Sequence, residues 1–474
     1  MTVASKDYSP QMNTNTEAYF QVRPPPLPGQ RWNERSYFFL LVTTATLMLR
    51  PSDFFQTTFP YFLISFGFCL LFGAQVLQKE LTLDRILNQP IVTCMMGVAL
   101  GIFLSQVSHL NFERAILLTL VYFKTLAYVV MVFGLIKKTE RLENFCRWLL
   151  LFIFIGVTVS VLQFNGLIHL ENFDAAYKEG LSTFDENGKR NFIYRLKGVG
   201  IFSDPNDFCL ILQLGIALAL LIRPGLKRIW TKLATFFILG EFFYALLLTR
   251  SRGGFIALIV GGCVLLIEQY GIKKIVFPLL ILGPLVFGVF AGRQTNIDLS
   301  NRDDTAQHRI QLWSEGFRTM AKSPLFGLGA NDFQVVCGTG LVAHNSYVHA
   351  FSELGIFGGS FFFGIYFYII TAMRKVRPYI PDEKFLKNCR RLFYVAIIFN
   401  AFGLLSLSRV YTQTTYILPA LVISYLQIIR ARTGWAPEAF SKIEFYRLLV
   451  MGCGVVAIFQ IFILSFAQWG GGFN

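Results

Sequence analysis

The sequence predicts an all-α protein: a polytopic membrane helix bundle of about 12 to 13 transmembrane helices, with a large loop on one face. Of its 474 residues 54% are hydrophobic, the mean hydropathy is +0.52, and runs of roughly 20 apolar residues recur along the chain. A hydrocarbon layer about 30 Å thick needs helices of this length, and a soluble core cannot hide so many of them.

Thirteen apolar segments follow a polar arm. Residues 1–35 contain "RPPPLPGQR", which predicts a disordered cytoplasmic arm ahead of a transmembrane domain of 36–474. The first segment is short enough to be interfacial, and the tenth is long enough to contain a kink or a re-entrant turn. The predicted segments are 36–49, 60–77, 90–107, 115–136, 148–168, 200–222, 233–249, 253–268, 275–292, 345–373, 392–408, 413–429 and 448–467.

The basic residues orient the chain. Alternate loops carry 27 Lys and Arg on one side and 15 on the other, and the richer side is expected to be cytoplasmic. The net charge of +15 therefore reflects membrane topology, and no nucleic-acid partner is expected. The eight cysteines lie singly without a CxxC, so neither a disulfide framework nor a zinc site is predicted.

This orientation makes the outer face the informative one. All five histidines fall on or near it, together with the two longest loops, 169–199 and 293–343. Ten of the fifteen outer cations lie in those loops, where the positive-inside rule opposes them. We therefore expect these cations to have a function.

The stretch "LLLTRSRGGF" places Arg250 and Arg252 in a tight turn between two spans. One interpretation is that both side chains snorkel to lipid headgroups. The other is a phosphate site, because a guanidinium fork matches phosphate oxygens bidentately. Gly253 and Gly254 allow a close backbone approach, either for packing or for a ligand.

The stretch "RDDTAQHRIQLWSEGF" lies in the second large outer loop. Arg309, Trp313 and Gly316 have helical spacing, which predicts an amphipathic helix lying on the membrane surface. Arg309 then either covers that surface or points into a cavity and binds an anionic ligand.

The stretch "KGVGIFSDPNDFCL" begins the sixth predicted span. Asp204 and Asn206 are capping residue types and Pro205 suits a first helical turn, which explains the sequence structurally. The alternative is that Asp204 or Asp207 holds an arginine or an acceptor hydroxyl.

Two charged residues lie in the middle of predicted spans, Lys124 in "VYFKTLAY" and Glu241 in "ILGEFFY". Buried unpaired charges are costly in a membrane, so we expect these two side chains to pair with each other.

The stretch "HNSYVHAFSELGIFG" joins the last outer loop to the tenth segment. Asn345 or Ser346 can cap the helix that follows, and the positive end of that helix favours an anion. His344 would lie beside this anion site, unless the segment serves only as a helix cap. The glycines at 355, 358 and 359 form a small-residue surface for close helix packing.

Together these residues resemble the O-antigen ligase and polymerase superfamily of bacterial membrane glycosyltransferases. His344 and Asn345, then nine residues, Gly355, two residues and Gly358 match the ligase pattern completely. "LLTRSRGG" is similar to the family's Ser-Arg-Gly turn and places the family arginine on Arg252. "RIQLWSEGFRTMAKSPLFGLGANDF" places the second arginine on Arg309, and "GIFSDPNDF" resembles the family's Gly-x-Phe-x-x-Pro-Asn segment.

The resemblance implies a fold and a reaction. The fold is GT-C-like, and the enzymes are metal-independent, without a cofactor or a nucleotide sugar at the active site. A glycan on undecaprenyl pyrophosphate is transferred, on the periplasmic face of the inner membrane, to an acceptor sugar hydroxyl. The acceptor is lipid A–core for a ligase and the next lipid-linked repeat unit for a polymerase. The residue match covers about 198–360, and the apparent thirteenth span departs from the twelve usual in ligases.

We assign roles on this basis. Arg252 and Arg309 would stabilise the charge that develops on the pyrophosphate, and His344 would be the catalytic base or a second pyrophosphate ligand. Five residues are predicted to bind substrate: Arg250, Asn345, Asp204, Asn206 and Trp313. The favoured activity is an O-antigen or exopolysaccharide repeat-unit polymerase.

Three alternatives remain at this point. A ligase shares the same motifs. A polysaccharide flippase or other transporter has a similar number of spans, but transporters often show repeated halves and midplane sites, and the sequence shows no internal repeat. A non-enzymatic assembly partner would not need a histidine and two arginines.

Overall fold

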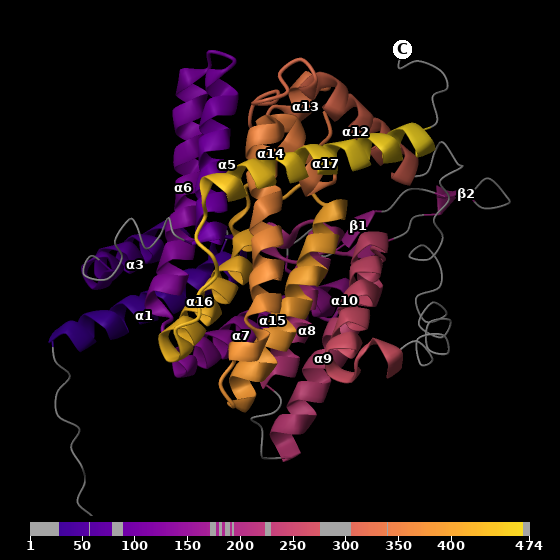
Figure 1. Cartoon of the computed structure of the whole chain (residues 1–474). Helices are drawn as coiled ribbons and strands as arrows, with labels where there is room; N and C mark the ends of the chain where they lie inside the picture. The colour runs from indigo at the N-terminus through magenta and orange to yellow at the C-terminus, as the bar shows by residue number, and fades with distance from the viewer. Residues whose placement is uncertain are drawn as a thin grey trace, which may run out of the picture.

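The computed structural model describes residues 28–55, 57–77, 89–170, 177–179, 183–184, 190–191, 194–222, 229–274, 305–338 and 340–467. Among these residues, ten helices are long and apolar enough to cross a membrane. The expected all-α polytopic bundle is therefore confirmed (Figure 1). The predicted segment 275–292 lies outside the described residues, as do residues 1–27.

The ten helices begin and end close to the predicted segments. They are α5 (Pro90–Val107), α6 (Phe112–Leu135), α7 (Thr139–Phe164), α8 (Pro205–Ile222), α9 (Ile229–Thr249), α10 (Arg252–Tyr270), α14 (Ser346–Lys375), α15 (Lys384–Gly403), α16 (Ile417–Thr433) and α17 (Lys442–Phe466). Short 3-10 turns flank several of them: η3 (Ile272–Lys274), η4 (Arg377–Tyr379), η5 (Leu404–Ser406) and η6 (Gln413–Tyr416).

Two further helices pair at one side of the bundle. They are α1 (Pro28–Leu49) and α3 (Tyr61–Leu77), joined through the short α2 (Pro51–Phe54), and they lie together at the indigo end of the colour scale (Figure 1). Helix α1 begins at Pro28, ahead of the expected boundary at 36. Helix α3 has 17 residues, which is short for a perpendicular span.

The two large outer loops contain short elements. In the first, β1 (Tyr177–Glu179) pairs antiparallel with β4 (Tyr194–Leu196), and β2 (Thr183–Phe184) pairs with β3 (Arg190–Asn191). The turn η1 (Gly200–Phe202) then leads into α8. In the second, α12 (Thr305–Met320) and α13 (Phe333–Val336) precede α14.

Contacts between helix ends show which of them lie together at one end of the bundle. Arg432 at the end of α16 contacts Glu383, just before α15, and donates to Thr139 at the start of α7 (2.7 Å). Lys375 at the end of α14 pairs with Glu438, just before α17 (2.8 Å). These residues all belong to the basic-rich loops, which therefore share one end of the bundle.

The motif residues lie at the opposite end. Here the side chain of Gln106, near the end of α5, donates to Asp332 (2.6 Å), and Ser346 at the start of α14 donates to the carbonyl of Leu407 (2.6 Å). The chain thus alternates between the two ends as the basic-residue pattern predicts.

Helix α14 is the centre of the bundle. It packs along α5, where a Cβ added to Gly101 would lie 2.8 Å from Cα of Gly358. Such a close backbone approach requires glycine, and it confirms the predicted small-residue packing at Gly358. Gly355 instead contacts the loop at Leu325, and Gly359 lies against Phe351 of its own helix. Helix α17 crosses α14 on another side, with Gly452 against Ser360, and its C-terminal half reaches α12 (Figure 1).

The predicted pairing of Lys124 with Glu241 is wrong. Lys124 is exposed on α6, whereas Glu241 is half-buried on α9, and no ion pair joins them among the described residues. The two residues face different neighbours because hydropathy fixes where a span lies and leaves its rotation about its own axis undetermined.

Candidate active site

A kink in α14 shapes the candidate site. Gly355 has φ 65° and ψ −168°, so the helix is interrupted there, as the length of this segment allows. The loop 324–329 takes up the backbone groups that the kink exposes. Four hydrogen bonds join them: Ile356 N to Pro324 O (2.9 Å), Phe357 N to Leu325 O (3.1 Å), Leu328 N to Ser352 O (3.0 Å) and Gly329 N to Glu353 O (3.1 Å).

Glycine is required on both sides of this joint. A Cβ on Gly327 would lie 2.5 Å from the backbone of Glu353, and a Cβ on Gly355 would lie 2.4 Å from that of Leu325. Both glycines also have a positive φ, which other L-residues rarely adopt. The motifs "PLFGLG" and His-Asn-x9-Gly therefore form one structural unit.

The buried carboxylate of Glu353 fixes the same loop. Its oxygens accept from the backbone amides of Asn331 (2.8 Å) and Phe333 (3.0 Å) and from the hydroxyl of Tyr411 (2.6 Å). His349 Nε2 lies 2.9 Å from the carboxylate. Glu353 is 1% exposed, so these contacts replace the water that a carboxylate otherwise needs.

The α5–α6 turn clamps the loop from outside. Gln106 donates to the carbonyl of Ala330 (2.8 Å) as well as to Asp332, and Arg114 pairs with Asp332 (2.7 Å). The amide of Ala330 donates to Ser105 (3.0 Å). Residues about 220 positions earlier in the chain thus hold the loop beside the kink.

His344 precedes this unit in a left-handed conformation, with φ 49°. Asn345 follows as the N-cap of α14, and its side-chain oxygen accepts from the amides of Tyr347 (3.0 Å) and Val348 (3.2 Å). A positive φ is uncommon outside glycine and costs energy, so the surroundings hold His344 in place. The side-chain oxygen of Asn345 serves the helix, as the capping interpretation predicts.

Trp313 holds the segment before His344. Its Nε1 donates to the carbonyl of Ala343 (2.7 Å), and its ring packs against Phe459 and Phe462 of α17. Arg309 lies one turn earlier on α12 and on the same face as Trp313. Trp313 therefore positions this segment, and the predicted substrate contact of its side chain stays a prediction.

The predicted amphipathic helix is confirmed as α12, but protein covers its apolar face. Ile310 and Phe317 are buried, and a Cβ on Gly316 would meet Phe333 and Ser352. Gly316 leaves room for these side chains of α13 and α14, and on the other side Trp313 and Phe317 pack against Phe459 of α17. The apolar face of α12 therefore contacts protein, and the prediction that it lies on the membrane surface is wrong for that face.

The α9–α10 turn presents Arg252 at the first position of α10. Ser251 caps this helix, accepting from the amide of Gly254 (3.1 Å), and donates to the side-chain oxygen of Asn206 (2.6 Å). Arg252 is half-buried, whereas Arg250 is exposed with φ 47°. The two glycines of the turn serve packing, since Cβ atoms there would meet Ser406 and Cys209.

Arg195, on β4, joins this turn. Its Nε donates to the carbonyl of Thr249 (2.9 Å) and its Nη2 to Asn206 (3.4 Å). Burial lowers the pKa of Arg195, and the positive charges of Arg309 and Arg252 lower it further, against the opposing effect of Asp204. Three arginines from three separate segments thus share one electrostatic environment.

These residues coincide with a known family. Residues 233–363 match the O-antigen ligase family. The match confirms the resemblance to the O-antigen ligase and polymerase superfamily, whose members transfer glycans. No curated protein matches the chain. The matched part holds Arg250, Arg252, Arg309, Trp313 and the pair His344–Asn345.

Several site residues lie outside the part that matches the O-antigen ligase family. The carboxylate of Asp207, at the start of α8, accepts from both Nε (2.8 Å) and Nη2 of the Arg409 guanidinium. This confirms the expectation that Asp204 or Asp207 holds an arginine. Burial alone would lower the pKa of Arg409, but bonding to Asp207 raises it above its usual value. The amide of Arg409 donates to Ser346 (3.0 Å) and so links α8 to the start of α14.

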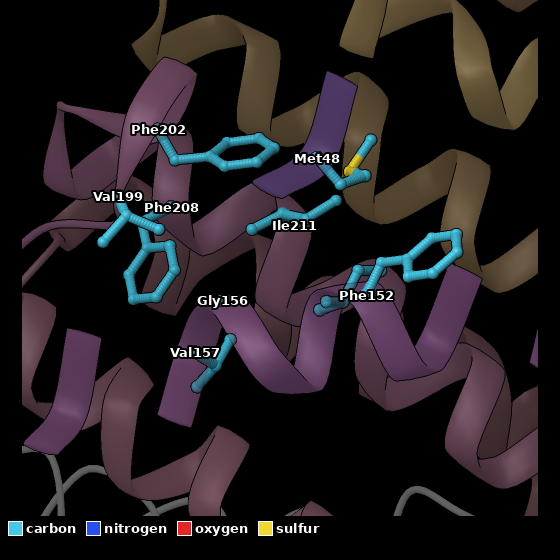
Figure 2. Close-up of a pocket in the computed structure, with 9 residues that line it drawn as sticks. Met48, Phe152, Gly156, Val157, Val199, Phe202, Phe208 and Ile211 are labelled. Atoms are coloured by element: carbon cyan, nitrogen blue, oxygen red, sulfur yellow. The ribbon is translucent and has the colours of Figure 1, made fainter. Parts of the chain in front are cut away.

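The Asp204–Asn206 turn has a rigid apolar backing. Val199, Phe202 and Phe208 line a void of about 10 Å³ together with Met48 and residues of α7 such as Phe152 and Val157 (Figure 2). A void of this size admits at most one water. On the polar side, Asp204 accepts from the amide of Asn206 (2.8 Å), and the side-chain oxygen of Asn206 accepts from Arg195 (3.4 Å).

Sequence reasoning missed Arg195, Arg409 and Glu353. Arg195 was among the outer cations that oppose the positive-inside rule, but no local motif marks it. Glu353 is a charge inside a predicted span, and such a charge is a functional or structural signal in itself. Among the described residues, no group of three or more His, Cys, Asp or Glu side chains is placed to hold a metal ion.

Proposed function

We propose that the chain transfers a glycan from undecaprenyl pyrophosphate to an acceptor sugar hydroxyl on the periplasmic face of the bacterial inner membrane. The observation that carries this proposal is that Arg195, Arg252 and Arg309, from three separate segments, share one electrostatic environment at the end of the bundle where α14 begins after His344. Cations that repel one another are costly to hold together. We therefore expect an anionic ligand to bind among them.

Each residue then has a chemical role. The acceptor oxygen forms a bond to the anomeric carbon of the glycan while the bond from that carbon to the pyrophosphate oxygen breaks. Charge grows on the leaving pyrophosphate, and preorganised guanidinium groups stabilise it. His344 takes the proton of the acceptor hydroxyl. No metal enters this scheme, because the three arginines supply the positive charge.

Repeat-unit polymerisation is our favoured form of this reaction, with the next lipid-linked repeat unit as acceptor. Ligation to lipid A–core uses the same groups and differs only in the acceptor. A transporter is disfavoured because the arginines cluster at the helix ends, whereas transporter sites lie near the bilayer midplane.

Reconstitution tests the proposal. Purified protein in proteoliposomes receives lipid-linked repeat units alone or together with lipid A–core, and products are resolved by gel and mass spectrometry. A ladder of polymers from the repeat units alone supports the polymerase. Transfer only to lipid A–core identifies a ligase, and flipping of the donor without transfer contradicts an enzymatic function.

A further inference from the structure

A second cavity lies at the end of the bundle opposite the candidate active site. It measures about 260 Å³ and is enclosed by the start of α5, the end of α14, the α16–α17 linker and the start of α17. Its walls are apolar and aromatic, with Ile91, Phe367, Tyr368 and Trp435 among them. The proposed glycan transfer makes no use of this cavity.

Charges of both signs surround the cavity. Lys375 pairs with Glu438 (2.8 Å), and Arg447 pairs with Glu444 (3.2 Å). Glu444 also accepts from the hydroxyl of Tyr368 (2.8 Å). Two cations and two carboxylates thus line one small space, so the lining is neutral overall while it offers separate partners for a phosphate and for an ammonium.

Stability alone does not explain these pairs. The side chains of Lys375, Glu438 and Arg447 are 55%, 77% and 58% exposed, whereas that of Glu444 is 18% exposed. Exposed ion pairs contribute about 0 to 1 kcal/mol, which is little for four charged groups around a cavity. The exposure of Lys375, Glu438 and Arg447 leaves these three accessible to a ligand, and the less exposed Glu444 lines the cavity.

An apolar helix face leads away from the charged cavity. On α17, Ile443, Tyr446 and Val450 are 78%, 67% and 72% exposed, next to the cavity residues Glu444 and Arg447. In a membrane protein such a face contacts acyl chains. A ligand with a zwitterionic head and apolar tails therefore fits both surfaces at once.

We propose that this cavity binds the headgroup of a zwitterionic phospholipid that carries a primary ammonium, such as phosphatidylethanolamine. Its phosphate accepts from Lys375 and Arg447, and its ammonium donates to Glu438 and Glu444. The aromatic walls cover the glycerol region, and the acyl chains run along the exposed face of α17. The site is separate from the candidate active site, so it stands or fails independently of glycan transfer.

Lipid retention tests this assignment. The full chain is reconstituted in nanodiscs of equal phosphatidylethanolamine and phosphatidylglycerol and extracted mildly, and the retained lipids are counted by native mass spectrometry. We expect about fivefold enrichment of phosphatidylethanolamine, in the range that charge-assisted hydrogen bonds provide. Equal retention of the two lipids overturns the proposal whether or not any variant folds.

Variants locate the effect. The double variant Glu438→Gln, Glu444→Gln keeps the shape of both side chains and should remove the enrichment. The matched control is Asp382→Asn, Lys387→Met, an exposed ion pair at the same end that does not line the cavity, and it should keep the enrichment. Enrichment that survives in the first pair, or that is lost equally in the control, contradicts the proposal.

A soluble headgroup distinguishes a lipid site from a general phosphate site. Glycerophosphoethanolamine lacks acyl chains, so at millimolar concentration it should displace little of the retained lipid. Complete displacement would assign the cavity to a soluble phosphoethanolamine compound and overturn the lipid assignment. A preference for phosphatidylcholine would overturn the assigned contacts between the ammonium and the two carboxylates, because choline has no N–H to donate.

Discussion

At the scale of single residues, the site depends on charges that are held in place by other side chains. Asn206 accepts from both Arg195 and Ser251, and Trp313 holds the segment before His344. A guanidinium that is fixed in advance needs no reorganisation when charge develops on a leaving group. The residue predictions therefore concern the arginines and the histidine separately.

The three arginines should be needed for turnover. Arg195→Ala, Arg252→Ala and Arg309→Ala should each lower the transfer rate by about 100-fold or more, as the loss of one preorganised donor typically does. Lysine should restore only part of the rate, because it lacks the bidentate fork. The measurement is polymer yield per membrane-embedded protein.

Arg318→Ala is the matched control for these variants. Arg318 is exposed on α12 and paired with Glu315, so its loss should leave the rate near that of the wild type. Activity close to wild type in all three site variants would leave headgroup contact as the only role for these arginines.

His344 should act in the transfer step. His344→Ala should lose turnover and still bind the lipid-linked donor. The wild-type rate should fall on the acid side, because a protonated imidazole cannot accept the hydroxyl proton. Donor binding and transfer rate are measured separately on the purified variant.

Two other outcomes are informative for His344. Loss of donor affinity with an unchanged acid limb would make the histidine a pyrophosphate ligand. Wild-type values for both measurements would leave only its place beside the helix cap.

At the scale of elements, the joint between the loop 324–329 and the kink of α14 is the critical feature. Its hydrogen bonds replace those that a straight helix would make, and its two glycines allow the backbones to touch. The joint sets the direction of the first turns of α14, and with it the place of His344.

Substitution at the joint should be costly. Gly355→Ala and Gly327→Ala should each lower the melting temperature and the activity, because the new Cβ meets backbone atoms and the positive φ becomes strained by about 1 to 2 kcal/mol or more. Gly262→Ala is the control: it lies in α10 with open space around it and should be neutral or slightly stabilising. Equal melting temperatures for all three variants would contradict the requirement for glycine at this joint.

His349 should be less tolerant of substitution than its sequence position suggests. It lies one turn or so after His344, and its Nε2 contacts the buried carboxylate of Glu353 (2.9 Å). His349→Ala removes a partner of a buried carboxylate and should destabilise the fold by about 3 kcal/mol. Thermal unfolding in detergent measures this loss, and the double variant His349→Ala, Glu353→Gln should recover part of it.

At the scale of the whole molecule, the alternation of helix ends places the candidate site and the second cavity at opposite ends of the bundle. The structure sets which loops share an end, and the basic residues predict which end faces the cytoplasm. If the bundle had the opposite orientation in the membrane, the candidate site would lie in the wrong compartment for a lipid-linked donor on the outer face.

Reporter fusions test this arrangement. Fusions after residues 140, 228 and 382 should report the cytoplasm, and those after 185 and 320 the periplasm. A cytoplasmic signal after residue 320 would contradict the proposed active face, because α12 carries Arg309.

The sequence alone determined the membrane class, most of the spans, the matching motifs and the possibility of a kink in α14. These features depend on hydropathy and on spacings of a few residues, which a linear chain displays directly. It also pointed to His344, Arg252 and Arg309, because each stands in a short motif.

Only the tertiary structure decided which residues meet. Asp207 and Arg409 are 202 positions apart, Gln106 and Asp332 are 226 apart, and Arg195 joins Arg252 and Arg309 from a third segment. Span hydropathy carries no information on helix rotation, which is why the pairing of Lys124 with Glu241 was wrong. Long-range contacts are chosen by the packing of the whole bundle, where each helix turns to the neighbours that satisfy its buried charges.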